Sequence, residues 1–215
     1  MKTLKLTLAS TFRKHYALFY LTLFSIILLC VRIKITHSFS YLFMVWNLFL
    51  AYLPLAITIL MVNNVKLIER KVLYYPLLFS WLLLLPNAPY IITDFIHLKI
   101  ETSVPVWFDI LLLISFTSGG ILAGLASMKH MFSIISIKTN PLAAWLITAI
   151  TCMLTGFGIY VGRYLRYNSW DIISNPGELF ADILHNIAGS TPFGITLGFG
   201  GFLFLLFHLY YKAEV

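Results

Sequence analysis

The sequence predicts an all-α integral membrane protein that forms a single transmembrane domain over residues 1–215. Two observations predict this fold class. Hydrophobic residues make up 60% of the chain and charged residues only 11%, whereas about one-quarter of the residues in soluble domains are charged. The apolar residues also fall into about six runs, each near the ~20 residues that a helix needs to cross a bilayer. The predicted spans cover residues 16–31, 41–62, 72–92, 105–128, 141–162 and 192–211.

The first run, 16–31, follows a basic stretch and therefore resembles a signal peptide. Arg32 and Lys34 follow it without a small-residue cleavage pattern, so we expect a retained spanning helix. The second, fourth, fifth and sixth runs are apolar stretches bounded by proline, glycine or charge, and each is predicted to cross once.

The third run is irregular. Its clean apolar part, 72–85, would rise only about 21 Å at 1.5 Å per residue, which is too short to span alone. The segment Pro86-Asn87-Ala88-Pro89 then breaks the helix, because proline lacks an N–H and disfavours helical geometry in the residue before it. Freed carbonyls need partners other than lipid, so we expect the break to face protein or a wet cavity. Asn87 is a natural partner or cap for them.

The longest loop, between the fifth and sixth spans, contains a further predicted helix. Asn175-Pro176-Gly177-Glu178 reads as a helix start. Apolar side chains then follow on one face, namely Leu179, Phe180, Ile183, Leu184 and Ile187. This pattern predicts a short amphipathic helix that lies on the membrane or docks onto the bundle.

Basic residues predict the orientation in the bilayer. Lys and Arg number 10 in the terminal segments and even-numbered loops, against 5 in the alternate loops. The positive-inside rule therefore predicts that both termini are cytoplasmic. The acidic residues divide the other way, since all but Glu69 and Glu214 fall on the outer side. The net charge of +7 is scattered over helix ends, which argues against nucleic acid as a partner.

Glycines at one-turn spacing predict close helix packing in three spans, because small residues let helix backbones approach each other in lipid. The pairs are Gly120 and Gly124, Gly158 and Gly162, and Gly194 and Gly198. Packing within one chain is the expected use of these faces, and packing between copies of the chain is the alternative. The middle of every span lacks charge, which disfavours an ion relay through the bilayer.

One group of candidate site residues follows the proline break. Asp94, His97 and Glu101 are spaced three and four apart, which on a helix places two acids and an imidazole on one stripe. Such a stripe could bind a metal or pass a proton, and a metal would need a further ligand such as His185 or Asp109. The solvated face of a short interfacial helix gives the same spacing.

A second group lies at the outer end of the fifth span. Arg163 and Arg166 are one turn apart and form a donor fork that suits phosphate or carboxylate. Salt bridges to Asp109 or Asp171 are the structural alternative. Trp170 and neighbouring tyrosines fit an aromatic belt. Asn47, one turn into the second span, is costly in hydrocarbon unless hydrogen-bonded and should face the same cluster.

Several strings in the chain together resemble the bacterial membrane family called domain of unknown function 1361. The strings are Trp46-Asn47-Leu48 with Pro54, Leu85-Pro86-Asn87-Ala88-Pro89-Tyr90 with Thr93-Asp94 and His97-Leu98, Trp107 with Asp109, Gly162-Arg163 with Leu165-Arg166, and Asn168-Ser169-Trp170-Asp171. The resemblance implies a multi-pass bacterial inner-membrane protein, and its strings coincide with the outer-face residues above.

These observations predict one polar, anion-accepting pocket at the outer ends of spans two to five. The residues predicted to bind its ligand are Asn47, Asn87, Arg163, Arg166, Asn168 and Trp170. The residues predicted to position or transfer protons are Asp94, His97, Asp109 and Asp171. A lipid-linked or envelope substrate suits such a site, and the sequence assigns no cofactor or metal to it.

Two other functions compete with this interpretation. In a scaffold or assembly subunit, the same outer-face residues would be structural salt bridges, and the glycine faces or the loop helix would engage another membrane protein. A transporter is favoured by the broken third span and disfavoured by the lack of charge in the middle of the membrane.

Overall fold

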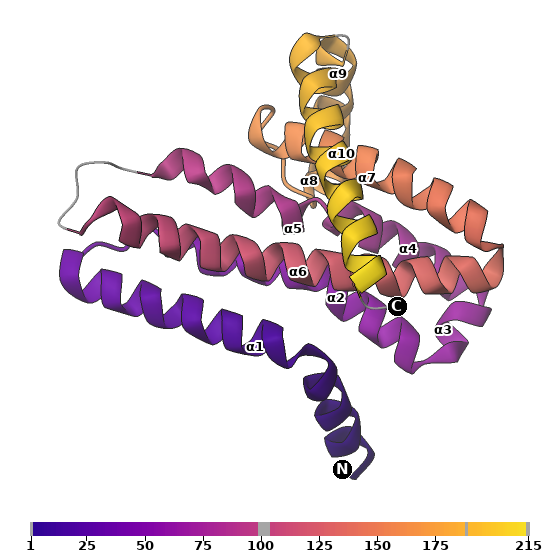
Figure 1. Cartoon of the computed structure of the whole chain (residues 1–215). Coiled ribbons are helices and arrows are strands. Elements are labelled where there is room, and N and C mark those ends of the chain that lie inside the picture. The colour runs from indigo at the N-terminus through magenta and orange to yellow at the C-terminus, as the bar shows by residue number, and fades with distance from the viewer. Residues whose placement is uncertain (1, 99–103, 188, 214–215) are drawn as a thin grey trace.

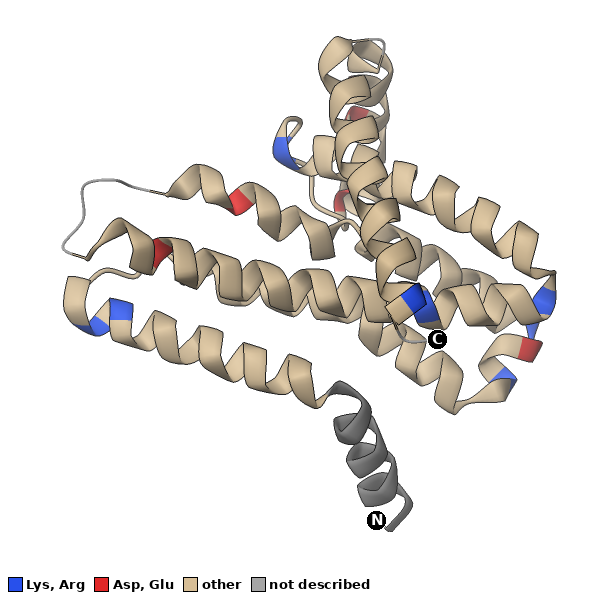
Figure 2. Cartoon of the chain, viewed as in Figure 1, with Lys and Arg blue, Asp and Glu red and all other residues tan. Residues whose placement is uncertain are grey.

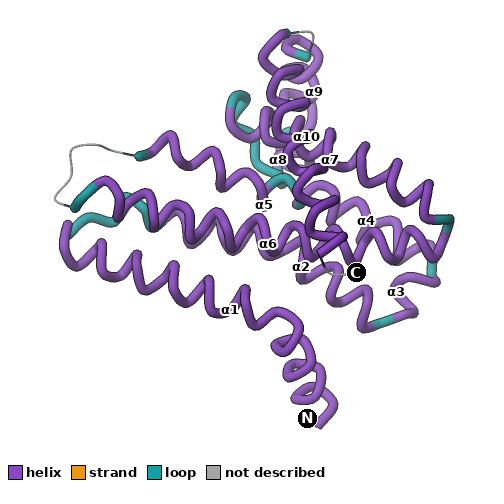
Figure 3. Tube along the Cα trace, in the orientation of Figure 1, coloured by secondary structure: helices purple, strands orange, loops and turns teal. Residues whose placement is uncertain are grey.

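The computed structural model describes residues 2–98, 104–187 and 189–213, with the backbone alone for residues 2–15. Every regular element in this part of the chain is a helix (Figure 3). Six helical segments are long and apolar enough to cross a membrane, so the chain is a multi-pass membrane protein. Their bounds are Tyr16–Thr36, Phe43–Asn63, Lys71–His97, Val106–Lys138, Pro141–Arg163 and Ser190–Ala213.

The prediction of about six spanning helices is confirmed. The third segment ends at His97, five residues past the expected limit of 92, and two further helices also continue past their expected ends. Helix α1 covers Lys2–Thr36 and so includes Arg32, which we had expected to follow the helix. Helix α6 covers Val106–Lys138, ten residues beyond the predicted limit of 128. Burial explains the second extension, because Met131, Phe132 and their neighbours pack into the core and remain helical.

The remaining spans are ordinary helices, joined by short segments. Helix α2 covers Phe43–Asn63 and is linked through the five-residue α3, Val65–Glu69, to the third span. Helix α7 covers Pro141–Arg163 and α10 covers Ser190–Ala213. Proline stands at the first position of α7, where its missing N–H would have no helical partner, and Asn140 caps that end by accepting a hydrogen bond from Ala143 N.

The third span is broken where the sequence predicts it. Helix α4, Lys71–Leu84, is followed by the short α5, Asn87–Tyr90, and by a 3₁₀ helix η1, Ile91–His97. Ala88 N donates to Leu85 O at 3.0 Å, a bond between residues three apart, as in a 3₁₀ turn. The third span is therefore one irregular helical segment, and its turns are tighter from Ile91 to His97 than in α4.

Helix α6 lies at the centre of the bundle. It packs against α1, α2, α5, η1, α7 and α10, and α1, α2 and α6 run side by side (Figure 1). Near its start Leu112, Leu113 and Phe116 are fully buried. Near its end Met128 and Met131 pack with Trp81 of α4. Its long buried face organises the rest of the fold.

Glycines on α6 and α7 hold the broken span from two sides. A Cβ on Gly120 would lie 3.0 Å from Ala88 O, and one on Gly124 would lie 2.8 Å from Ala88 Cβ. On the other side, a Cβ on Gly158 would lie 2.5 Å from Pro86 Cγ. Only glycine leaves room for α5 between these two helices, so two of the predicted close-packing motifs act within the chain.

The third motif, on α10, is used differently from the expectation. Gly194 and Gly198 have open space where a Cβ would project. Close contact between α7 and α10 comes instead from Gly156, whose Cβ would lie 2.5 Å from Thr196 O, and from Gly200, whose Cβ would lie 2.9 Å from Cys152 O. Helix α10 therefore packs against α7 through the face that carries Thr196 and Gly200, and not through the face that carries Gly194 and Gly198.

The loop between α7 and α10 forms two helices, α8, Asp171–Ser174, and α9, Pro176–Asn186. Leu179 and Ile183 of α9 are half-buried, whereas Phe180 and Leu184 are exposed. The predicted amphipathic helix is therefore present, with one edge against the bundle and an apolar face left open.

Acidic residues gather toward one end of the bundle, whereas basic residues lie at both ends (Figure 2). We call the end where α1 and α7 finish and α2 and α6 begin the distal end, and the opposite end the basic end. Among the described residues, Glu69 is the acidic residue of the basic end. The other acidic side chains belong to the distal end, at Asp94, Asp109, Asp171, Glu178 and Asp182.

The glycine contacts between α7 and α10 predict a stability difference. Gly156→Ala should destabilise the protein by about 1–3 kcal/mol, because the new methyl group would meet backbone atoms that cannot move aside. Gly198→Ala is the matched control and should cost nothing, since its Cβ enters open space and alanine favours helix. Thermal unfolding in mild detergent measures both, and equal midpoints for the two variants would contradict this account of the packing.

Candidate functional site

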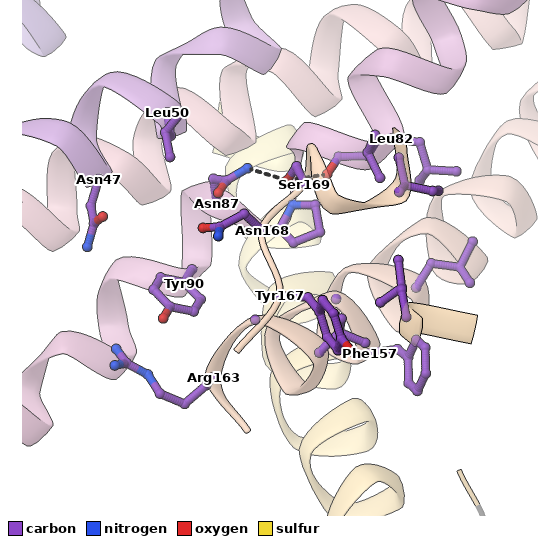
Figure 4. A pocket seen from close by; sticks show the side chains of 18 of the residues that line it. Asn47, Leu50, Leu82, Asn87, Tyr90, Phe157, Arg163, Tyr167, Asn168 and Ser169 are labelled. Carbon is purple, nitrogen blue, oxygen red and sulfur yellow. Dashed lines mark hydrogen bonds between the residues drawn. The ribbon is translucent and has the colours of Figure 1, made fainter. Parts of the chain in front are cut away.

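A cavity of about 510 Å³ lies at the distal end, beside the break in the third span. Helices α2, α4, α5, α7 and η1 form its walls, and the segment 167–172 and α9 cross it. Figure 4 shows Asn47, Tyr90 and Arg163 on one side of the segment that carries Ser169, and Leu82 and Phe157 on the other. The polar side chains of the lining therefore gather on one side, where Leu50 also lies, and the other side is apolar.

Asp94 is the most enclosed charge of the cavity lining, with 1% of its surface exposed. Its Oδ1 accepts a hydrogen bond from Arg163 Nη2 at 2.7 Å, and its Oδ2 accepts one from Asn47 Nδ2 at 2.8 Å. Arg163 Nε also donates to Thr93 Oγ1 at 2.8 Å. This cluster ties η1 to both α2 and α7, and it satisfies a carboxylate that would be costly to bury alone.

Tyr90 completes the surroundings of Arg163. The guanidinium carbon lies 4.6 Å from the centre of the Tyr90 ring, within the range of a cation–π interaction. The same ring packs on Gly162, where a Cβ would lie 3.1 Å from Tyr90 Cε2. Because Arg163 is compensated by Asp94, this polar side of the cavity carries no net charge from the pair.

The proline break is closed by side chains, as its position predicts. Asn87 Nδ2 donates to Leu84 O at 2.8 Å and to Ser169 Oγ at 3.2 Å. Ser169 Oγ in turn donates to Leu83 O at 3.1 Å. Two carbonyls beside the break thus receive hydrogen bonds from protein instead of water, and the loop after α7 is held over the third span.

His97 ends η1 at the rim of the cavity. Its ring packs edge-on against Phe43, with the ring centres 5.1 Å apart. Its carbonyl accepts a hydrogen bond from Tyr41 Oη at 3.1 Å. The imidazole itself is exposed, and it forms no hydrogen bond with another described residue.

The turn after α7 is fixed by Asp171, which lies outside the cavity. Asp171 Oδ2 accepts from Asn168 N at 2.6 Å, and Oδ1 accepts from Ser174 Oγ at 3.0 Å. The Asn168 N–H, more than the Ser174 hydroxyl, lowers the pKa of Asp171 below its ordinary value of 3.8. The carboxylate therefore stays ionised as a cap for the turn. In the same loop, the hydrogen bond that Tyr167 Oη donates to Asp182 raises the pKa of the Tyr167 phenol.

Asp109 forms a second buried ion pair. It lies in the first turn of α6 and is fully buried, and Arg32 of α1 is 2% exposed. Arg32 Nε donates to Asp109 Oδ1 at 2.7 Å, and Nη2 donates to Oδ2 at 3.2 Å. The guanidinium carbon also lies 4.2 Å from the centre of the Tyr41 ring. This bidentate pair joins the first span to the central helix.

The structure brings together part of the predicted site. The predicted residues that line the cavity are Asn47, Asn87, Asp94, His97, Arg163 and Asn168. Four others do not line it. Asp109 is paired with Arg32, Asp171 caps the loop turn, and Arg166 and Trp170 are exposed outside the lining. Arg166 has a positive φ of 64°, so the chain turns there and the expected fork with Arg163 does not form.

The possible metal stripe ends early. Helix η1 stops at His97 and Leu98 is extended, while Glu101 lies outside the described residues. Both carboxylate oxygens of Asp94 already accept hydrogen bonds, and the other ligand candidates are remote, with Asp109 on Arg32 and His185 exposed on α9. Within the described ranges, His, Cys, Asp and Glu form no group of three that could hold a metal ion.

Some residues of the site were missed by sequence reasoning. Thr93 bonds Arg163, and Ser169 closes the break; both stand inside the strings of the family resemblance, which was the signal available. Tyr167, one of the tyrosines predicted to fit an aromatic belt, instead lines the cavity from the loop. Arg32 was interpreted only as a charge that follows the first span, and the residues around it in the sequence do not indicate Asp109 as its partner.

A bundle of six spanning segments with an amphipathic cavity at one end defines a multi-pass membrane protein. Residues 46–206 match the family described as "Protein of unknown function (DUF1361)", and the chain belongs to that family. The match covers every residue of the cavity lining except Phe43. The searches of curated proteins and of solved structures found no match.

The Arg32–Asp109 pair predicts strong coupling between its two side chains. Arg32→Met or Asp109→Leu alone should destabilise the protein by about 3–5 kcal/mol, because each leaves a buried charge without its partner. The double variant should lose much less than the sum of the two, since no charge is then stranded. Unfolding equilibria in detergent for all four proteins form the test, and additive losses would contradict a direct pair.

Proposed function

We propose that this protein binds a lipid-linked amphiphile in the distal cavity, entered sideways from the membrane. The amphipathic lining is the observation that carries the proposal. Phe79 of α4 and Leu154 of α7 line the apolar side and are also exposed on the surface of the bundle. A hydrocarbon chain could therefore pass from the lipid phase into the cavity, while a polar headgroup reaches Asn168 and Arg163.

The polar side favours a headgroup recognised through hydrogen bonds. The predicted anion site depended on Arg163 and Arg166, but Asp94 compensates the first and the second is outside the lining. Hydroxyl and amide groups of a ligand would find partners in the side chains of Asn168 and Tyr167 and in the remaining capacity of Asn87. We therefore propose a headgroup rich in such groups, as in a lipid-linked envelope component.

If the bound molecule is a substrate, we propose that His97 transfers the proton. Its imidazole is at the rim, exposed, and has no hydrogen-bond partner among the described residues. Asp94 is held in two hydrogen bonds and acts by positioning Arg163 and Asn47. Asp109 and Asp171 take structural roles. We further propose that the distal end faces away from the cytoplasm, with both termini cytoplasmic, because Lys and Arg favour the basic end.

A non-catalytic scaffold is the second candidate, and one observation favours it. Both buried acids are fully engaged in ion pairs that join different spans, which is what a rigid framework needs. A scaffold would keep these pairs and have no use for an open cavity. Filling the cavity without touching the ion pairs therefore separates the two candidates.

The proposal predicts that an amphiphile stays with the protein during purification in mild detergent. Val161→Trp would fill the cavity from α7, where Val161 is half-buried in its lining. We expect this variant to lose the bound molecule by about tenfold or more, because the indole takes its space. Mass spectrometry of solvent extracts, normalised to protein, gives the amount retained.

Leu146→Trp is the matched control, since Leu146 is an exposed residue of the same helix outside the cavity lining. It should retain the amphiphile at the wild-type level. Both variants need an unfolding midpoint near that of the wild type. If the wild type carries only bulk lipid, or if both tryptophan variants lose the same molecules, the cavity is not the binding site.

A further inference from the structure

A second cavity, of about 530 Å³, opens between α4 and α7 toward the basic end of the bundle. Ile135 and Lys138 of α6 line its floor. Leu78 of α4 with Ile147 and Ile150 of α7 form apolar walls, and both isoleucines are exposed on the outer surface. The cavity is therefore open to the hydrocarbon around the bundle.

Two lysines line this cavity at its end toward the basic end of the bundle. Lys71 is the first residue of α4, and Lys138 is the last residue of α6. Both are exposed, and neither forms an ion pair in the part of the chain that the structure describes. The Lys138 ammonium lies 4.5 Å from the centre of the Tyr74 ring, which holds it over the cavity.

Helix α4 begins beside this cavity, where its first residue Lys71 belongs to the lining. Arg70, at the N-cap, is exposed and provides no side-chain hydrogen bond to the first turn of this 14-residue helix. Backbone N–H groups at an uncapped helix start favour a negative charge. Glu69, the acidic residue of this end among those that the structure describes, does not line the cavity.

We propose that this cavity binds an anionic phospholipid of the leaflet at the basic end. The phosphate lies between Lys71 and Lys138, and an acyl chain follows Leu78 and Ile150 toward the middle of the membrane. Two ammonium groups that form no ion pair with a described residue, beside an apolar wall, match the two parts of such a lipid. A free phosphate would use the charges but not the wall, and an apolar partner would use the wall but leave the charges unpaired.

This site is separate from the distal cavity. Leu82 and Leu154 line both cavities, so the two adjoin at their apolar ends, but their polar ends lie at opposite ends of α4 and α7. The lipid proposal uses none of the polar residues of the distal cavity. The lipid proposal is therefore tested independently of the distal cavity.

Binding of phosphatidylglycerol and phosphatidylcholine to the full-length protein, measured by native mass spectrometry, tests the proposal. The wild type should prefer phosphatidylglycerol, and the double variant Lys71→Gln/Lys138→Gln should bind it about tenfold more weakly, with phosphatidylcholine unchanged. Lys66→Gln/Lys212→Gln removes the same charge at the same end outside the cavity, and should change binding by less than about twofold. Equal losses in the two double variants would overturn the proposal, since general surface charge would then explain them.

Ile150→Trp tests the apolar wall while both lysines remain. It should weaken phosphatidylglycerol binding, because the indole occupies the path of the acyl chain. Unchanged binding of phosphatidylglycerol in this variant would overturn the proposed position of the acyl chain. Inorganic phosphate should not displace the lipid at equal concentration, and displacement would identify a simple phosphate site instead. Wild-type unfolding midpoints are required of all variants, and the exposed positions of the lysines favour this outcome.

Discussion

Backbone groups in hydrocarbon have no water to bind, and this constraint shapes the structure around the third span. Pro86 and Pro89 interrupt the helical hydrogen-bond ladder, so the carbonyls of Leu83 and Leu84 before the break need other partners. Asn87 and Ser169 supply those partners, and Ser169 comes from the loop after α7. The break therefore brings a distant loop over the bundle and creates the roof of the distal cavity.

Glycines on the neighbouring helices make room for the broken third span. Gly120 and Gly124 admit α5 against α6, while Gly158 admits Pro86 against α7. An irregular segment of this kind is stable only when its neighbours approach closely on both sides. The Asp94–Arg163 pair then fixes how α7 lies against η1, so hydrogen bonding, packing and charge all act on one short stretch of chain.

Local patterns in the sequence predicted the spans, the position of the break and the role of Asn87, because each depends on residues close together in the chain. Asn47 was expected to need a polar partner and does contact Asp94. Partners across the bundle were beyond such reasoning. The three arginines predicted on the outer side, Arg32, Arg163 and Arg166, could pair with several acids there, and nothing local indicated that Asp109 belongs to Arg32. The turn at Arg166, which separates it from Arg163, also depends on the folded loop.

The Arg32–Asp109 pair has a consequence for how the protein is made. Its two residues are 77 positions apart, so Arg32 leaves the ribosome long before Asp109, with two further spans between them. Until the central helix arrives, the first helix presents a cation at the membrane boundary without its counterion. Helix α1 can therefore reach its final packing only after α6, the fourth span, has been inserted. Assembly of this bundle thus depends on the order of synthesis.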